Sequence, residues 1–160
     1  MSRDRVIIFV ILVLLIFSGC VTNEEARYPE EYKFSVSNFS FAVGDDADRV
    51  VSMLGKANYF TSAPSCAGVG NDELYVYSGF KLTAHRSGGG AVISAIELTN
   101  DRTSTVEGVC IGDSEEKIVE AYGNGERFSG GIEFYTDNCR LRFFVREGRV
   151  TGIKYLQNDE

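Results

Sequence analysis

The sequence has little of three things on which large groups of proteins depend: histidine, basic charge and long apolar runs. His85 is its one histidine, and one imidazole does not supply the ligand set of a zinc site. Lysine and arginine number 16 against 23 aspartates and glutamates, a formal charge of −7. Nucleic-acid binding needs cations for phosphate contacts. We therefore expect no metal, no cofactor and no nucleic-acid partner.

A catalytic constellation is also missing from the sequence. Neither a paired acid and base nor a nucleophile with a base and an orienting group can be recognised. Cys66 and His85 are a conceivable nucleophile and base, but nothing near either residue suggests an activated thiol. We expect a protein that is not an enzyme, and an enzyme remains the least favoured alternative.

The longest apolar run, residues 6–17, follows two arginines near the start of the chain. As a helix it would span roughly 18 Å, which is short of the ~30 Å hydrocarbon core of a bilayer. The run is therefore typical of a secretory signal segment and not of a membrane span. Ser18, Gly19 and Cys20 follow it. They resemble the lipobox of bacterial lipoproteins, in which small residues precede a cysteine that is lipid-modified and becomes the mature N-terminus.

The lipobox resemblance implies that residues 1–19 are a lipoprotein signal peptide and that Cys20 carries lipid. The mature chain would then be anchored to the cell membrane on its extracytoplasmic side. The alternative is an ordinary signal peptide cleaved near Gly19, which leaves Cys20 as a free thiol. Residues 20–32 are acidic, polar and interrupted by a proline, and we predict that they form a tether outside the folded core.

The rest of the chain repeats itself. One copy of the pattern lies in about residues 33–100 and the second in about residues 102–157. Both copies together are short enough to share one core, so we predict a single two-repeat domain over residues 33–157.

Each copy contains a short predicted helix with a capping signal at its start and a glycine at its end. An apolar residue, a glycine and an aspartate open an acidic turn, and an apolar run follows that ends at a glycine. The pattern predicts Asp45 and Asp113 as N-caps, because a carboxylate there accepts bonds from free backbone N–H groups. Gly55 and Gly123 then follow the last helical turns.

Three strand-like segments follow each helix, and a short apolar piece precedes it. The strand-like segments are residues 73–78, 80–85 and 92–99 in the first copy and 132–135, 139–146 and 150–156 in the second. The apolar pieces are residues 39–42 and 107–110. We predict an α+β fold of two tandem β-α-β-β-β units that share one antiparallel sheet, with two short helices on one face.

Tandem helix-then-three-strand units opened by an apolar-Gly-Asp turn resemble the β-lactamase-inhibitor-protein-like fold. They are also similar to outer-membrane assembly lipoproteins of the SmpA/OmlA type. The motif is the Asp-capped helix that ends in Leu-Gly at 54–55 or Tyr-Gly at 122–123. Ser-Cys-Ala at 65–67 and residues 75–80 also resemble segments of small lipoproteins from Gram-positive bacteria. The resemblance implies a binding or assembly role, without implying β-lactamase as the partner.

Three cysteines remain beyond Cys20. Aligning the copies sets Cys110 and Cys139 at inward positions of the second half, which predicts a disulfide between them, with two separate buried thiols as the alternative. Cys66 lies in residues 61–71, which the second copy lacks, and an insertion in one repeat is typical of a surface loop. We expect Cys66 to be a packed thiol of that loop.

The alternation along the strands predicts which side chains the helices leave uncovered. Removing residues 1–19 leaves 14 cations against 22 acids, a charge of −8, but the outward face carries about +3. We predict a binding face there, because tyrosine and arginine dominate interface hot spots. A solvated face without a ligand is the alternative. The predicted binding residues are Tyr75, Tyr77, Lys81, Tyr135, Arg140, Arg142, Phe144 and Arg146.

These features predict a membrane-anchored extracytoplasmic lipoprotein. We expect it to act as a non-catalytic binding module for a protein or an anionic envelope component. An envelope-assembly or scaffold subunit, which would use residues 61–71 or the helices, is the alternative.

Overall fold

The computed structural model describes residues 30–66 and 68–158. The predicted signal peptide and the predicted lipid attachment at Cys20 lie outside these residues. The elements in chain order are β1 (Phe34–Val36), β2 (Phe39–Phe41), α2 (Ala47–Leu54), β3 (Tyr59–Pro64), β4 (Asn71–Val76), β5 (Phe80–Ser87), β6 (Gly90–Leu98), α3 (Glu115–Tyr122), β7 (Glu126–Phe128), β8 (Gly131–Tyr135), β9 (Cys139–Arg146) and β10 (Arg149–Gln157).

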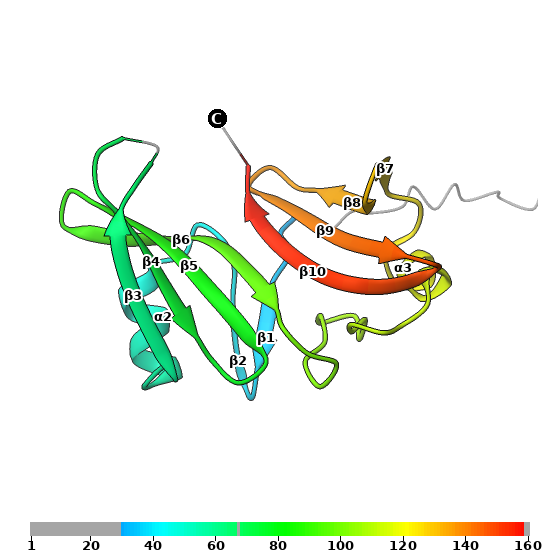
Figure 1. Ribbon diagram of the computed structural model, residues 1–160, viewed down its shortest axis with the longest axis horizontal. Coiled ribbons are helices and arrows are strands. Elements are labelled where there is room, and N and C mark those ends of the chain that lie inside the picture. Colours follow the sequence, from blue (N-terminus) through cyan, green and yellow to red (C-terminus); the bar gives the residue numbers. More distant parts are fainter. Residues whose placement is uncertain (1–29, 67, 159–160) are drawn as a thin grey trace, which may run out of the picture.

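Eight strands form one antiparallel sheet in the order β3-β4-β5-β6-β10-β9-β8-β7, and β1 and β2 form a separate two-stranded sheet. The order describes two meanders of four strands, green and orange in Figure 1, whose last strands lie side by side. Strands β6 and β10 pair over four residues each, from Leu98 opposite Ile153 to Ala95 opposite Leu156. With two helices beside this sheet, the described chain is an α+β fold.

The core lies on one face of the large sheet. Val50 of α2, Ile118 of α3 and Phe34 of β1 are fully buried in one apolar cluster with Leu82 of β5 and Leu141 of β9. A short helix with one apolar stripe cannot cover a sheet alone, so both helices and the β1–β2 hairpin share this face. Figure 1 shows the hairpin between the two meanders.

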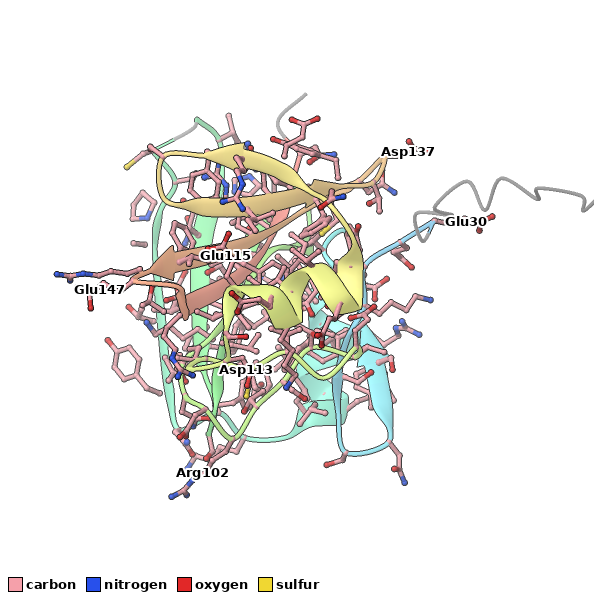
Figure 2. The ribbon with its side chains drawn as sticks, turned by 90° about the vertical axis from the view of Figure 1, so that its right-hand side faces the viewer. Glu30, Arg102, Asp113, Glu115, Asp137 and Glu147 are labelled. Carbon is pink, nitrogen blue, oxygen red and sulfur yellow. The ribbon has the colours of Figure 1, made fainter. Side chains whose placement is uncertain are left out.

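Ion pairs tie each helix to strands of the meander that follows it. Arg86 of β5 bonds Asp48 of α2 at 2.5 Å and Glu73 of β4 at 2.6 Å. Arg127 of β7 bonds Glu115 of α3 at 2.6 Å. Glu115 lies at the start of α3 in Figure 2. These contacts place both helices on the same side of the sheet as the core.

The N-cap of α2 is one residue later than the sequence predicts. Asp46 is the N-cap, and its carboxylate accepts from the Arg49 N–H at 2.9 Å. The Asp45 carboxylate instead accepts from the Ala42 N–H at 3.0 Å and closes the turn before the helix. Both aspartates can accept backbone bonds, and the preceding turn takes the first of them. Gly55 ends the helix as predicted, with φ of 76°.

The same shift occurs at α3, where Ser114 is the N-cap and Asp113 closes the preceding turn. One Asp113 oxygen accepts from the Cys110 N–H at 2.7 Å and from the Lys117 ammonium at 2.8 Å. Lys117 and the Cys110 amide together lower the pKa of Asp113 to about 2. The Asp113 carboxylate therefore stays ionised and holds this turn through the physiological range. Gly123 ends α3 as predicted.

We expect Asp113→Asn to lower the free energy of unfolding at neutral pH by about 1–2 kcal/mol, because it removes charge-assisted hydrogen bonds. The pKa of Asp113 in the folded chain lies below its value of about 3.9 in the unfolded chain. The carboxylate therefore stabilises the fold fully above about pH 3.9, and this stabilisation is lost as the pH falls toward the folded-state pKa. Urea unfolding between neutral pH and about pH 2 should therefore show a shallower acid dependence for the variant. Asp137→Asn, in the exposed β8–β9 turn (Figure 2), is the control. Identical acid dependence of Asp113→Asn and the natural chain would contradict this role.

The prediction that each unit begins with a strand of the shared sheet is wrong. In the first half, β2 forms as expected but pairs only with β1. In the second half, residues 107–110 contribute a single antiparallel bridge, Cys110 to Ser104, and no strand. Each helix is instead followed by four strands of the sheet.

The additional strands are β3 and β7, which form the two edges. The predicted insertion, residues 61–71, is therefore only partly a loop: its first residues belong to β3, and residues 65–70 connect β3 to β4. The boundary of the predicted tether also changes. Tyr32 is only 2% exposed and packs edge-on against Tyr122 at 6.0 Å, so it belongs to the core.

Candidate docking surface on the open face of the sheet

The face of the large sheet opposite the helices is called the open face here. Its centre carries a row of charged side chains that crosses five adjacent strands. Residues directly opposite each other in antiparallel strands point to the same side, and the pairing joins each member to the next. The cross-strand row is Lys81, Glu97, Lys154, Arg142 and Glu133.

The cations of this row are matched by acids. Lys154 lies 3.2 Å and Lys81 lies 3.9 Å from the Glu97 carboxylate. Arg142 Nε donates to Glu133 at 2.6 Å. The Lys81, Glu97 and Lys154 side chains are 36–40% exposed, so a partner could still reach them. The row thus combines three cations and two acids at fixed positions, with Lys154 and Arg142 as adjacent cations.

Two aromatic rings lie next to the row. Phe128 of β7 and Phe144 of β9 meet edge to face, with centroids 5.6 Å apart. The Arg142 guanidinium lies 4.5 Å from the centre of the Phe128 ring, and the Lys154 ammonium lies 5.9 Å from that of Phe144. Cation–π contact holds these cations over the rings. Phe144 is flanked on both neighbouring strands by glycines, at Gly131 and Gly152.

Glu133 is a nearly buried carboxylate under this surface, with 8% of the residue exposed. Burial by itself raises the pKa of Glu133, but hydrogen bonds from the Tyr135 hydroxyl at 2.6 Å and from Arg142 outweigh it and hold this pKa below its ordinary range. The bond to Glu133 in turn raises the pKa of Tyr135. Glu133 and Arg142 therefore form a charged pair at physiological pH, and Tyr135 keeps its proton.

The structure places Lys81, Tyr135, Arg142 and Phe144 on the open face, as the sequence predicts. Arg140 also lies there, opposite Tyr135. Arg146 continues this side of β9 at its outer end, where its side chain is 82% exposed and lies 4.0 Å from Glu147. Figure 2 shows Glu147 at the tip of the β9–β10 hairpin.

The predicted positions of Tyr75 and Tyr77 are wrong. Tyr75 pairs with buried Leu82 and packs against Phe60 at 4.8 Å, so it faces the helices. Tyr77 stacks on Phe80 at 5.0 Å and packs against the core. Leu74 and Val76 occupy the open face instead. The segment Leu-Tyr-Val-Tyr at 74–77 has apolar character on both sides, so its alternation does not identify the inner one.

The predicted excess of positive charge is also smaller in the structure. Glu126 lies opposite Glu133, and Asp72 lies opposite His85, so both acids share the open face. They lower its formal charge from the predicted +3 to +1. Sequence reasoning missed Glu126 and Phe128 because β7 is only three residues long, too short for an alternation signal.

The predicted disulfide between Cys110 and Cys139 is wrong, because the structure has both residues and Cys66 as free thiols. The Cys110 thiol donates to Asp113 at 3.2 Å in the turn before α3. Cys139 is fully buried at the start of β9, where burial raises its pKa to about 12. Cys66 is exposed and not packed, which corrects the prediction for its loop.

These environments predict the order of thiol alkylation in the folded protein. Cys66 should react first because only exposed thiols meet the reagent, and Cys139 should stay unmodified until the chain unfolds. Peptide mass mapping after timed iodoacetamide treatment, with and without urea, measures this order. Recovery of a Cys110–Cys139 cross-linked peptide without reduction would contradict the assignment of free thiols.

No group of three or more His, Cys, Asp and Glu side chains in residues 30–66 and 68–158 is placed to hold a metal ion. Within the same residues, neither helix has the length and apolar character needed to cross a bilayer.

The chain matches no protein-family model and no curated protein. Its fold is similar to the 1.5 Å crystal structure of an extracellular protein containing an SCP domain from Bacillus anthracis str. Ames. The TM-score is 0.53 at 10% sequence identity, and the match covers 78% of this chain and 48% of that one. The match thus spans about half the length of that protein. At this identity the similarity concerns the fold alone.

Proposed function

We propose that this chain is a lipid-anchored extracytoplasmic binding module, without catalytic activity, that holds a partner on its open face. The observation that carries the proposal is the cross-strand row beside Phe128 and Phe144. Aromatic rings and arginines supply most of the energy of protein interfaces, and fixed charges around them select the partner.

The pairing of the cations favours a protein over an anionic envelope polymer as the partner. Glu97 lies between Lys81 and Lys154, and Glu133 neutralises Arg142, so a polyanion would meet two acids along with the cations. A protein surface can instead present opposite charges in the matching order and pack apolar side chains on the rings.

The two halves are proposed to be tandem units of one design, which would make the open face a composite of both. Corresponding hydrogen bonds support this. Gly44 N–H donates to the Ile93 carbonyl at 2.7 Å, and Gly112 N–H donates to the Val150 carbonyl at 2.8 Å. In both cases the turn before a helix is tied to the last strand of the meander that follows it.

The lipid anchor is proposed from Ser18, Gly19 and Cys20. The extracellular source of the structural neighbour agrees with an extracytoplasmic location. Cys20→Ser should move the chain from the membrane fraction to the soluble fraction and abolish labelling by a palmitate analogue, because no acyl chain can then be attached. Retention of the label in Cys20→Ser would overturn the assignment.

Binding by the open face is tested with the chain from Thr22 onward and membranes isolated from the producing cells. Lys154→Gln with Arg146→Gln should lower the bound fraction about tenfold and flatten its salt dependence, since each charge contributes up to about 1 kcal/mol. Arg49→Gln with Lys56→Gln, exposed on and after α2, removes the same charge from the helix side as a matched control. Equal loss in both variants would indicate a general charge effect and contradict the open-face proposal.

A further inference from the structure

Strand β3 forms one edge of the large sheet and pairs only with β4. Figure 1 shows it as the outermost strand of the green meander. All six of its residues are exposed, and Tyr59 and Phe60 are 58% and 52% exposed. An edge strand of this kind presents a row of backbone N–H and C=O groups to which another strand can pair.

The opposite edge, β7, differs in length and charge. It has three residues, two of which are Glu126 and Arg127, and Arg127 is bonded to α3. Short edge strands with charged side chains resist pairing with another chain. β3 is twice as long and has no charged residue, and its one edge-protecting residue is Pro64 at its last position.

The surroundings of β3 extend its neutral character. Residues 57–71 contain no charged side chain, although the whole chain has a formal charge of −7. Two copies of an acidic chain repel each other over most of their surfaces, and the repulsion is weakest where both surfaces are neutral. The β3 edge is thus a place where one copy can approach another with little electrostatic cost.

We propose that β3 is a self-association edge, where two copies of the chain pair antiparallel and continue their sheets into one. Antiparallel pairing of identical strands is two-fold symmetric, and side chains that lie opposite each other must share a face. One register that satisfies this sets Thr61 of one copy opposite Thr61 of the other. Tyr59 then lies opposite Ala63 and Phe60 opposite Ser62, so each large side chain meets a small one.

The association closes at two copies. Each chain offers one β3 edge, and the charged β7 edge resists the further pairing that would extend the assembly. The open face continues across the two-fold axis. This inference concerns the sheet edge and does not depend on what the open face binds.

Cysteine cross-linking tests the proposal on the full chain in detergent, in a Cys66→Ser background. Thr61→Cys, or Ser62→Cys in the neighbouring symmetric register, should give a covalent dimer on mild oxidation, because cysteines directly opposite across a strand pair can form a disulfide. Arg127→Cys on the β7 edge and the Cys66→Ser parent should remain monomeric. Failure of both β3 positions to cross-link would overturn the proposal.

Sedimentation equilibrium in density-matched detergent gives an independent measure. The natural chain should show the mass of two copies in the micromolar range, and Thr61→Lys should raise the dissociation constant at least tenfold by placing like charges at the axis. Thermal unfolding of Thr61→Lys checks that this exposed substitution leaves the fold intact. Two sedimentation results would overturn the second copy as the occupant: the mass of one copy at all concentrations, or open-ended assemblies. Capture of a different polypeptide at Thr61→Cys in cells would also overturn it.

Discussion

Phe34→Ala is expected to lower the free energy of unfolding by about 3–5 kcal/mol, the cost typical of truncating a buried phenylalanine. Phe34 is fully buried on β1, and its ring lies 4.9 Å from Phe80 of β5, 5.5 Å from Phe41 of β2 and 6.1 Å from Tyr155 of β10. It therefore contacts both meanders at the point where β6 and β10 pair over only four residues each.

Urea unfolding followed by circular dichroism measures this effect. If residues 33–157 form the predicted single domain, the variant should keep one cooperative transition at a lower midpoint, with an unchanged slope. Val106→Ala, which truncates a 58% exposed apolar side chain outside the helices and strands, is the control and should change stability by less than about 1 kcal/mol. Two separated transitions in the natural chain would contradict the prediction of a single domain.

Arg142→Ala is expected to lower the free energy of unfolding by about 2–3 kcal/mol at neutral pH, because it leaves the nearly buried Glu133 without its cation. In the natural chain Tyr135 and Arg142 hold the pKa of Glu133 below its ordinary value. Without Arg142, burial is opposed by the Tyr135 hydrogen bond and the charge of Arg140, so the pKa of Glu133 should rise and protonation should relieve part of the cost.

The sign of the pH dependence follows from this change. The stabilisation that Glu133 contributes in the natural chain is present above the unfolded pKa of about 4.3 and is lost as the pH falls below it. The difference between Arg142→Ala and the natural chain should therefore be largest at pH 7 and smaller near pH 4. Arg146→Ala, 82% exposed on the same strand, is the matched control and should stay within about 0.5 kcal/mol. A deficit of Arg142→Ala that does not vary with pH would contradict the charged-pair account.

Most of the fold could be predicted from the sequence. Both helices and the six predicted strand-like segments that follow them lie within about two residues of the observed elements, and β9 matches at both ends. Apolar periodicity predicts these elements because burial of one face is what stabilises them. The residues of β3 show no such apolar periodicity, because all six are exposed and neither face of the strand is buried.

The candidate site was harder to predict than the fold. The alternation of polar and apolar residues assigned Arg140, Arg142 and Phe144 to the correct face, since Leu141 and Phe143 between them are fully buried. Tyr75 and Tyr77 could not be assigned this way, because the pairing of β4 with β5, and not composition, decides which side faces the helices. The ion pairs that balance the cations depend on strand order, which a single sequence does not state.

Site-specific photocrosslinking in living cells tests the open-face proposal most directly. A photoreactive phenylalanine analogue at position 135, where the natural Tyr135 is 40% exposed, would report on whatever touches the open face. The same analogue in place of Val119 on α3 and Met53 on α2, which are 38% and 58% exposed, samples the helix side. We predict one discrete protein adduct from position 135 and none from positions 119 and 53. An adduct from position 119 or 53, with none from position 135, would contradict the open face as the docking surface.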